Sequence, residues 1–592
     1  MIMDYFLLGE FVIVVSGKHL NFLYLSDNDF RGSQFPDFNG SLSRLRHLNI
    51  ANAGLSWRIL NQLGNLSRLD SNHVGENNWL KLVNKLPLHL ENLQLRSCGL
   101  HGIILSQPLN GSFASLIRVI NVSRNRLTSS SALKWLTNIS SNLAELNLEY
   151  NNLIQASIPG IFRNMASLKH LYLSDNQLRD GIQGILGNIC TLQTLDLSHN
   201  NLTGLFPQLP RCIESSLEIF NLDWNSLHGP LPDFTSHNRF NGTVTESLGC
   251  LSRLKHLLAS RNSMEDLLSP NTLFITEMDL SSNMFDGSLP LLPYINVLNL
   301  AKNRFTGSLD PFCKITSKYL TFLESGNIPA WIGENLPSLV FLSLQANDFN
   351  GRILANFCWL AHMQILDQSE NNISGTIPSC LNNLTAMAQK RVYTYGGGRI
   401  FEYVIGFLFR RTGYNYVEKA RVRWKGNDYE YERYIGLFRV IDLSSNGLTG
   451  EIPNEITSLF ELVAPNLSRN GLTGLIPHNI NQLKQLKSLN LSENHLSGRI
   501  PVTMADLTFL SYLDLYNKLL GRIPSSTQLQ TFDALVFVGN ALAFVGNQAL
   551  CGSQVTVQCT EDDTNPNKPD HNKLENGDVF RKWFYAQMRV GF

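Results

Sequence analysis

Short apolar phrases with a fixed internal order recur along most of this chain. In residues 441–453, IDLSSNGLTGEIP, apolar and polar residues alternate, an asparagine follows, and a glycine and a proline close the phrase. Alternation of this kind predicts a short strand with one buried side, and glycine and proline predict the turn after it. Similar phrases fill residues 465–477 and 489–501. The pattern therefore predicts one short strand per phrase, with the strands stacked in parallel.

The phrases repeat at a constant interval. Leu443, Leu467, Leu491 and Leu515 follow one another at steps of 24 residues (467 − 443, 491 − 467 and 515 − 491). A period of 20 to 29 residues with the order L-x-x-L-x-L-x-x-N is the signature of the leucine-rich repeat. Related phrases extend back to residues 23–32, roughly eighteen in all, against the about three that a solenoid needs for stability.

Each position of the phrase has its own role. The leucines point inward, where neighbouring coils bury them, because no single coil can bury its own core. The asparagine side chain is expected to bond backbone groups of adjacent coils that would otherwise be buried without partners. In LQLRSCGL, Cys98 occupies this position, which is the known alternative. We expect the residue just before each asparagine to project near the concave edge.

The ending L-[ST]-G-x-I-P resembles the plant-specific leucine-rich repeats of plant cell-surface receptors and polygalacturonase-inhibiting proteins. The segments FVGNQALCG (544–552) and FRKWFYAQM (580–588), with an acidic stretch between them, resemble the end of a receptor-like protein ectodomain. They are similar to the class that perceives fungal ethylene-inducing xylanase. The resemblance covers most of residues 20–525. It implies an α/β solenoid, a horseshoe or superhelix with its parallel β-sheet on the concave face, interrupted by an island and without a cofactor.

The departures from the repeat divide the chain into segments. Residues 385–435 hold no L-x-L-x-x-N phrase but contain the motif WKG (424–426). They match the island of receptor-like proteins in position and in this motif. We expect, in order, a degenerate N-terminal segment, leucine-rich repeats, the island, further repeats, a C-terminal cap and an acidic juxtamembrane tail: 1–19, 20–384, 385–435, 436–533, 534–560 and 561–592.

Charge and motifs exclude several function classes. The 592 residues contain 48 basic and 48 acidic side chains, so there is no basic excess for nucleic acid. We find no H-E-x-x-H, G-x-S-x-G or G-x-x-x-x-G-K-[ST] motif and no kinase loop, so we do not expect an enzyme. No stretch reaches the about 18 apolar residues of a membrane span. The resemblance implies that an N-terminal cap and a transmembrane helix are missing from this chain.

Cysteine spacing predicts disulfides between coils. Two pairs are 22 residues apart, close to the length of one coil, which would bring their sulfur atoms together; two buried thiols are the alternative for each pair. The resemblance adds a third pair in the C-terminal cap. The predicted pairs are Cys190 with Cys212, Cys358 with Cys380, and Cys551 with Cys559.

Sequons for N-linked glycans are frequent, which favours a secreted or extracellular chain, although an asparagine-rich repeat produces some by chance. The candidates are Asn39, Asn65, Asn110, Asn121, Asn138, Asn201, Asn241, Asn372, Asn383, Asn466 and Asn490.

Two surfaces are candidates for ligand binding. Loops on a rigid scaffold often carry binding residues, and Tyr, Trp and Arg are enriched at interface hot spots. The alternative is that these aromatic residues pack the island onto the solenoid or are ordinary surface residues. The island candidates are Arg410, Arg411, Tyr414, Tyr416, Trp424, Tyr429 and Tyr431, and the concave-edge candidates are Tyr150, Asp175, His199 and Trp224.

The resemblance implies a plasma-membrane receptor-like protein whose extracellular part recognises a protein or peptide, with microbial cell-wall hydrolases among the candidates. Its partners would be a co-receptor kinase at residues 436–533 and an adaptor kinase at the acidic stretch 561–578, which can also be a plain solvated spacer. A secreted hydrolase inhibitor or decoy of the polygalacturonase-inhibitor kind, and a non-functional receptor fragment, remain alternatives.

Overall fold

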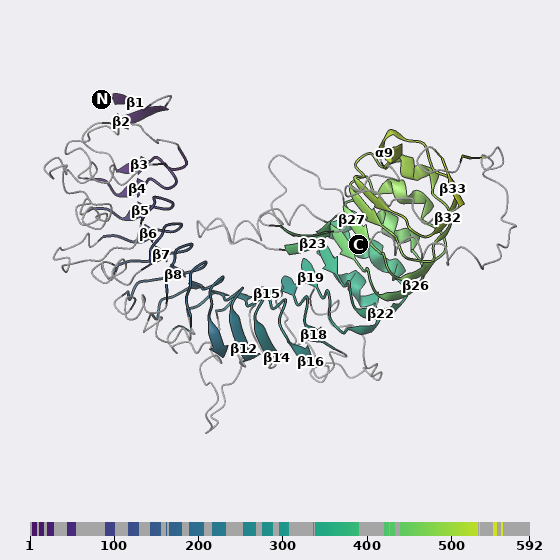
Figure 1. Ribbon diagram of the computed structural model, residues 1–592, viewed down its shortest axis with the longest axis horizontal. Coiled ribbons are helices and arrows are strands. Elements are labelled where there is room, and N and C mark those ends of the chain that lie inside the picture. Colours follow the sequence, from purple (N-terminus) through teal and green to yellow (C-terminus); the bar gives the residue numbers. More distant parts are fainter. Residues whose placement is uncertain are drawn as a thin grey trace, which may run out of the picture.

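The computed structural model shows the coils following one another along a curved arc, from β3 at one end to β33 at the other (Figure 1). The described residues are 3–8, 11–16, 21–28, 44–54, 89–100, 116–128, 136, 142–154, 162, 165–179, 189–205, 213, 216–231, 253–267, 275–287, 295–306, 336, 338–353, 355–389, 420–424, 427–431, 439–530, 532, 549–552 and 558–559.

One long parallel sheet forms from the short strands that the repeated phrase predicts. Within the described residues it has seventeen strands, and β3 pairs only with β4 and β31 only with β29, so the sheet is open. Its strands, in spatial order, are β3 (Phe22–Tyr24), β4 (His47–Asn49), β5 (Asn92–Gln94), β6 (Val119–Asn121), β7 (Glu145–Asn147), β8 (His170–Tyr172), β9 (Thr194–Asp196), β11 (Ile219–Asn221), β13 (His256–Leu258), β15 (Glu277–Asp279), β17 (Val297–Asn299), β19 (Phe341–Ser343), β21 (Ile365–Asp367), β25 (Val440–Asp442), β27 (Ala464–Asn466), β29 (Ser488–Asn490) and β31 (Tyr512–Asp514).

Shorter parallel sheets follow from the L-[ST]-G part of the repeat. In Figure 1, β15 of the long sheet lies on the inner side of the arc, with β14, β16 and β18 farther out. The strands of these sheets are β10 (Thr203–Leu205), β12 (Ser226–Leu231) and β14 (Ser263–Leu267); β16 (Asp286–Gly287) and β18 (Arg304–Phe305); β20 (Asn350–Arg352), β22 (Asn372–Gly375), β26 (Gly447–Glu451) and β28 (Gly471–Thr473); and β30 (Ser497–Arg499), β32 (Lys518–Arg522) and β33 (Ala549–Cys551).

Short helices complete the coils. Proline precedes η5, η7, η8 and η9 as their N-cap residue, consistent with the proline that closes each phrase. The described helices are η4 (Ala355–Trp359), η5 (Ser379–Asn383), α7 (Thr385–Ala388), η7 (Asn454–Ser458), η8 (His478–Gln482), η9 (Val502–Asp506) and α9 (Thr527–Gln530).

The register stacks equivalent residues of successive coils and so builds the core. Leu171 of β8 lies between Leu146 of β7 and Leu195 of β9, and all three are fully buried. Burying a leucine side chain contributes about 1.5–3 kcal/mol, which only the stacking of neighbouring coils makes available here.

The asparagine after each strand bonds neighbouring coils, as the repeat predicts. Asn176 donates through Nδ2 to the carbonyls of Leu173 and Ser174 in its own coil and of Leu148 in the preceding coil, each at 3.0 Å. Its Oδ1 accepts from the backbone N–H of Leu153 at 3.1 Å. At the equivalent position, the Cys98 thiol donates to the carbonyl of Ile50 in the preceding coil at 3.5 Å.

The repeat resumes without a break after the island. Strand β21 pairs directly with β25, so that Leu366 lies beside Ile441. Asn446 donates to the carbonyl of Gln368 at 2.9 Å and accepts from the N–H of Ile373 at 3.0 Å. The coils on the two sides of the island are therefore direct neighbours in the sheet.

The solenoid extends slightly into the segment assigned to the island. Helix α7 begins at Thr385, and Met387 is fully buried in the common core. The N–H of Glu461 also donates to the carbonyl of Met387 at 2.9 Å. Farther along, β23 (Ala420–Trp424) and β24 (Asn427–Tyr431) form an antiparallel hairpin, and at the N-terminus β1 (Met3–Leu8) and β2 (Phe11–Ser16) form another.

Two residues break the repeat inside the solenoid. Gln368 occupies an inward position equivalent to Leu443, is 0% exposed, and its side-chain nitrogen and oxygen have no hydrogen-bond partner within the described part of the chain. Pro465 lies at the inward position beside Ile441 and has no N–H to donate. Accordingly, β27 pairs with β29 only at Asn466 and Asn490.

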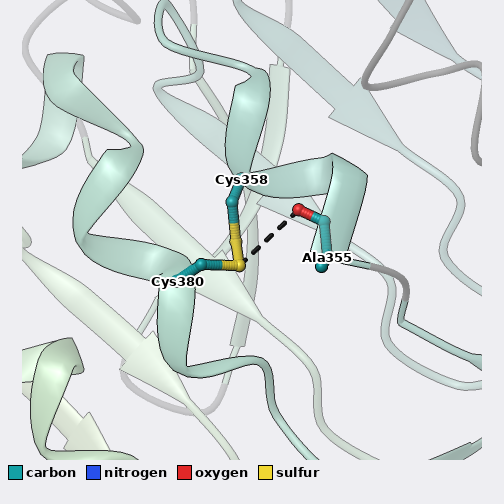
Figure 2. The surroundings of a disulfide bond; sticks show 3 residues. All are labelled: Ala355, Cys358 and Cys380. Carbon is teal, nitrogen blue, oxygen red and sulfur yellow. Dashed lines mark hydrogen bonds between the residues drawn. A yellow bond between two sulfur atoms is a disulfide. The ribbon is translucent and has the colours of Figure 1, made fainter.

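Disulfides join the coils where the cysteine spacing predicts them. Cys358 of η4 and Cys380 of η5 are bonded, with an S–S distance of 2.07 Å. The Sγ atom of Cys380 lies 3.5 Å from the carbonyl oxygen of Ala355 (Figure 2). Cys551 is bonded to Cys559 at a sequence separation of 8, the pair that the resemblance implies for the C-terminal cap.

The remaining predicted pair is described on one side only. Cys190 is disulfide-bonded, and its predicted partner Cys212 lies outside the described residues.

Candidate functional site

The residue before the ladder asparagine has an unusual backbone conformation in the described coils from β3 to β29, whereas Tyr516, before Asn517, does not share it. Sixteen described residues other than glycine have positive φ angles, from 49° to 59°, and each of them occupies this position of its repeat. The left-handed conformation costs a non-glycine residue roughly 1–2 kcal/mol, so the repeat must impose it. We call the residues that it brings together, one per coil from β6 to β13, the edge row: Arg124, Tyr150, Asp175, His199, Trp224 and Arg261.

Four residues of the edge row line one open hollow, which we call hollow 1. Its volume is about 560 Å³, and it spans the coils of β7, β8, β9 and β11. Tyr150 is 45% exposed and Trp224 is 44% exposed. The sequence-predicted residues Tyr150, Asp175, His199 and Trp224 therefore lie together around a surface that a ligand can reach.

Two arginines that the sequence analysis did not select frame these aromatic rings. The guanidinium carbon of Arg124 lies 4.0 Å from the ring centroid of Tyr150. At the other end, Arg261 lies 3.7 Å from the Trp224 ring, and the His199 and Trp224 rings stack with centroids 5.2 Å apart. Stacked arginines hold exposed rings in place. Their position before the asparagine was the signal available in the sequence.

Carboxyl groups gather beside hollow 1. Burial, followed by the charge of Asp196, raises the pKa of Glu149 to about 7; the charge of Asp175 contributes to this increase, and hydrogen bonds from Asn147 and Ser174 oppose it. Burial also raises the pKa of Asp196. The donors to Asp196 Oδ1 are the N–H and hydroxyl of Ser198, at 3.0 and 2.7 Å, and Glu149 accepts from Asn147 at 2.9 Å. These donors carry no charge, and the raised pKa values favour the neutral form of both carboxyl groups.

A second, smaller hollow continues from the first. This hollow 2, of about 40 Å³, shares Trp224 with hollow 1 and extends across the coils of β13, β15, β17 and β19. It is lined by acids and bases together, namely Asp223, Asp279, Arg261 and Lys302. Burial, followed by the charge of Asp279, raises the pKa of Asp223, and burial raises the pKa of Asp279 to about 6.

The island candidates are only partly placed. Trp424, Tyr429 and Tyr431 belong to the β23–β24 hairpin, in which Val422 pairs with Tyr429 and Ala420 with Tyr431. The candidates Arg410, Arg411, Tyr414 and Tyr416 lie outside the described residues. In Figure 1, strand β23 of this hairpin lies on the inner side of the arc.

The structure corrects two of the predicted glycan sites. Asn121 and Asn466 are each 8% exposed. Nδ2 of Asn466, the atom that would carry a glycan, donates to Asp442 at 2.9 Å and to Ser444 at 3.0 Å. Asn121 occupies the equivalent position in β6, where its Oδ1 accepts from the N–H and hydroxyl of Ser123. These two sequons therefore reflect the strand phrase of the repeat, and both asparagine side chains are buried and hydrogen-bonded.

Three other sequon asparagines are exposed, and one is half-buried. Asn201, Asn372 and Asn383 are open to solvent, whereas Asn490 is half-buried and accepts from Ser492. The sequons at Asn39, Asn65, Asn110, Asn138 and Asn241 lie outside the described residues.

The described residues hold neither a candidate metal site nor a membrane-spanning helix. They contain no group of three or more His, Cys, Asp or Glu side chains that could hold a metal ion. Among the helices of that same part of the chain, none is long and apolar enough to cross a membrane.

Comparison with known proteins places the repeat in a family. The Leucine Rich Repeat family model matches residues 167–189, 191–212, 438–459 and 485–507. Receptor-like protein EIX2 of Solanum lycopersicum is 27% identical over 376 residues, covering 50% of this chain and 36% of that protein. Receptor like protein 27 of Arabidopsis thaliana is 30% identical over 474 residues, covering 76% of this chain and 51% of that protein. The chain thus spans about half or less of the length of these relatives.

A solved structure agrees with the fold. The crystal structure of PEPR1-AtPEP1 superposes with a TM-score of 0.52 and 23% identity, covering 87% of this chain and 61% of that one. The repeat, the parallel sheet of stacked coils and the relatives together identify this chain as a leucine-rich repeat protein similar to the plant receptor-like proteins.

Proposed function

We propose that this chain is the ligand-recognition part of a plant receptor-like protein, and that it binds an extracellular protein or peptide on its concave side. The observation that carries the proposal is hollow 1, where Tyr150, Asp175, His199 and Trp224 surround one accessible surface. Aromatic side chains held rigidly by neighbouring groups provide large contact area at low entropic cost, as interface hot spots require.

The relatives support the receptor interpretation over the inhibitor one. The EIX2 and EIX1 proteins of Solanum lycopersicum are receptor-like proteins by name, and the chain aligns with EIX1 at 35% identity over 275 residues. A receptor of this kind acts by binding, so the proposal assigns no catalytic residue. In the edge row, Arg124, Tyr150 and Trp224 are exposed and Asp175, His199 and Arg261 are half-buried, so a ligand can reach the row.

The proposal includes partners and a location. Signalling would pass through a co-receptor kinase at residues 436–533 and an adaptor kinase near residues 561–578, with the chain on the outer side of the plasma membrane. The island residues, including Trp424, would add a second contact to the same ligand. Both assignments rest on resemblance to the receptor-like proteins, and residues 561–578 lie outside the described part of the chain.

The experiment is a binding assay on the full chain expressed by secretion. A fungal xylanase and a panel of other secreted microbial cell-wall hydrolases are the probes, measured by surface plasmon resonance. The test variants are Trp224→Ala and Trp424→Ala. Tyr516→Ala is the control, because Tyr516 is an aromatic residue of similar exposure (42%) in the last coil of the sheet, several coils away from hollow 1.

Loss of the anchor at hollow 1 should weaken binding at least tenfold in Trp224→Ala, whereas Tyr516→Ala should leave it unchanged. Equal binding by all variants would remove both tryptophans from the site. If the chain instead inhibits the bound hydrolase with no effect of the tryptophans, the inhibitor alternative replaces the receptor.

A further inference from the structure

We propose that the first three strands of the long sheet, β3, β4 and β5, carry a second binding site, and that its ligand is an uncharged oligosaccharide of pyranose sugars. The site shares no residue with hollow 1, so it is independent of the proposed function. Two side chains from each strand make up this site, which we call the β3–β5 face: Phe22, Tyr24, His47, Asn49, Asn92 and Gln94.

The six side chains lie on the concave side of the sheet. In each strand the middle leucine is buried in the core, so the first and third residues point to the opposite side. The register then sets equivalent residues of neighbouring strands side by side. The first positions form a row of Phe22, His47 and Asn92, and the third positions form a row of Tyr24, Asn49 and Gln94. Each row therefore runs from an aromatic ring to an amide.

Three of these side chains are rings with nearly parallel planes. Phe22 and His47 stack with their centroids 4.4 Å apart and their planes 10° apart. The centroids of Phe22 and Tyr24 are 6.3 Å apart, and their planes differ by 15°. His47 covers one face of Phe22, yet Phe22 is 52% exposed and Tyr24 is 56% exposed. Exposed apolar groups that gather on one face indicate a contact surface.

Amide groups lie beside the rings and are open to a ligand. Nε2 of Gln94 donates to Oδ1 of Asn92 at 3.0 Å, which orients both side chains. Among the described residues, Oε1 of Gln94, Nδ2 of Asn92 and the hydroxyl of Tyr24 have no hydrogen-bond partner. The β3–β5 face therefore offers an acceptor, a donor and a group that can act as either.

The β3–β5 face carries no carboxylate, lysine or arginine. Arg46 and Glu91, which immediately precede β4 and β5, pair with each other at 3.3 Å. Elsewhere in the sheet, the first and third strand positions do hold acids, such as Glu145, Asp196 and Glu277. The absence of such groups at β3, β4 and β5 favours an uncharged ligand over an ionic one.

A pyranose sugar matches both parts of the β3–β5 face. Its ring C–H groups are weakly positive and pack on the negative face of an aromatic ring such as Phe22 or Tyr24. Its hydroxyl groups donate and accept hydrogen bonds, as Asn92 and Gln94 require. An apolar ligand would satisfy only the rings and leave the amides without partners.

The test is titration of the full chain with neutral and charged hexasaccharides by isothermal titration calorimetry. The neutral probes are cellohexaose, xylohexaose and chitin hexamer, and the charged one is a hexamer of galacturonic acid. The test variants are Phe22→Ala/Tyr24→Ala and Gln94→Leu, which removes the amide and keeps a similar size. Phe509→Ala is the matched control, because Phe509 is 60% exposed and follows η9 at the other end of the sheet.

At least one neutral hexasaccharide should bind the unaltered chain. Its affinity should fall at least tenfold in Phe22→Ala/Tyr24→Ala and at least threefold in Gln94→Leu, and it should stay within twofold in Phe509→Ala. The idea is overturned if no neutral probe binds, if the double variant binds as well as the unaltered chain, or if the galacturonic acid hexamer binds more tightly than the neutral probes.

The two sites can be tested separately. Trp224→Ala should leave the binding of the neutral hexasaccharide within twofold, because Trp224 belongs to hollow 1. A loss of sugar binding in this variant would place the sugar at hollow 1 and refute the β3–β5 site.

Discussion

Replacing Gln368 with leucine should stabilise the middle of the solenoid. The side chain is fully buried at an inward position where the next coil holds Leu443, and neither its nitrogen nor its oxygen has a partner within the described residues. Each buried, unsatisfied polar group costs about 1–3 kcal/mol. Leucine has a similar volume and no polar atom to desolvate, so Gln368→Leu should raise the local stability by about 2–4 kcal/mol.

Hydrogen exchange is the suitable assay, because stability in a repeat array is the sum of coil and interface terms and long arrays depart from two-state unfolding. Amides of β19, β21 and β25 should exchange more slowly in Gln368→Leu, by about a hundredfold for a gain near 3 kcal/mol. Amides of β5 to β8 serve as an internal reference. The reciprocal variant Leu443→Gln should accelerate exchange in the same coils.

The reasoning is refuted if Gln368→Leu leaves the exchange of β21 unchanged or accelerates it. That result would mean that the amide is satisfied in solution, for example by a buried water, and that the leucine displaces it.

Three further changes test other features of the solenoid. Pro465→Leu should restore a backbone N–H that can donate from β27 to β29. The free energy of local opening there should rise by about 1 kcal/mol, which slows amide exchange, and faster exchange would contradict this. The double variant Cys358→Ser/Cys380→Ser should lower the free energy of unfolding by about 3 kcal/mol, the loop-closure value for a 22-residue separation; an unchanged denaturation midpoint under non-reducing conditions would contradict it. Burial raises the pKa of Glu149 from 4.5 to about 7, so the folded state binds this proton more tightly than the unfolded chain does. The resulting contribution to stability is present below pH 4.5 and is lost as the pH rises to about 7. The Tm should therefore be higher at pH 5 than at pH 7.5, with a smaller difference in Glu149→Gln, and an opposite slope that the variant leaves unchanged would show that another group controls it.

Periodicity predicts the coil well because each position of the repeat has one physical task. The spacing of Leu443, Leu467 and Leu491 gives the strand register, and the residue before the asparagine gives the edge row. The pairing of Cys358 with Cys380 follows from the length of one coil.

Side-chain contacts between coils were harder to predict. Trp224 and Arg261 stack although they are 37 positions apart (261 − 224), because an insertion separates two coils that are adjacent in space. Within the described residues the side chain of Gln368 has no hydrogen-bond partner, and this depends on the shape of the surrounding core, which no single repeat encodes. The sequons at Asn121 and Asn466 arise from the repeat itself, because its strand phrase places N-x-S at a buried position. An N-x-S triplet inside this phrase therefore does not indicate an exposed asparagine.

The left-handed residue before each asparagine also limits how the concave surface can evolve. Its sixteen described occupants include acids, bases, amides, aromatic residues and alanine, but no valine, isoleucine or threonine. Branching at Cβ is strongly disfavoured at positive φ. Mutations at this position can exchange charge, size and aromaticity without disturbing the coil. Duplication or loss of a whole repeat would move every later residue of the row by one strand spacing, about 4.8 Å. Such a surface can change its specificity in discrete steps while the scaffold that carries it stays the same.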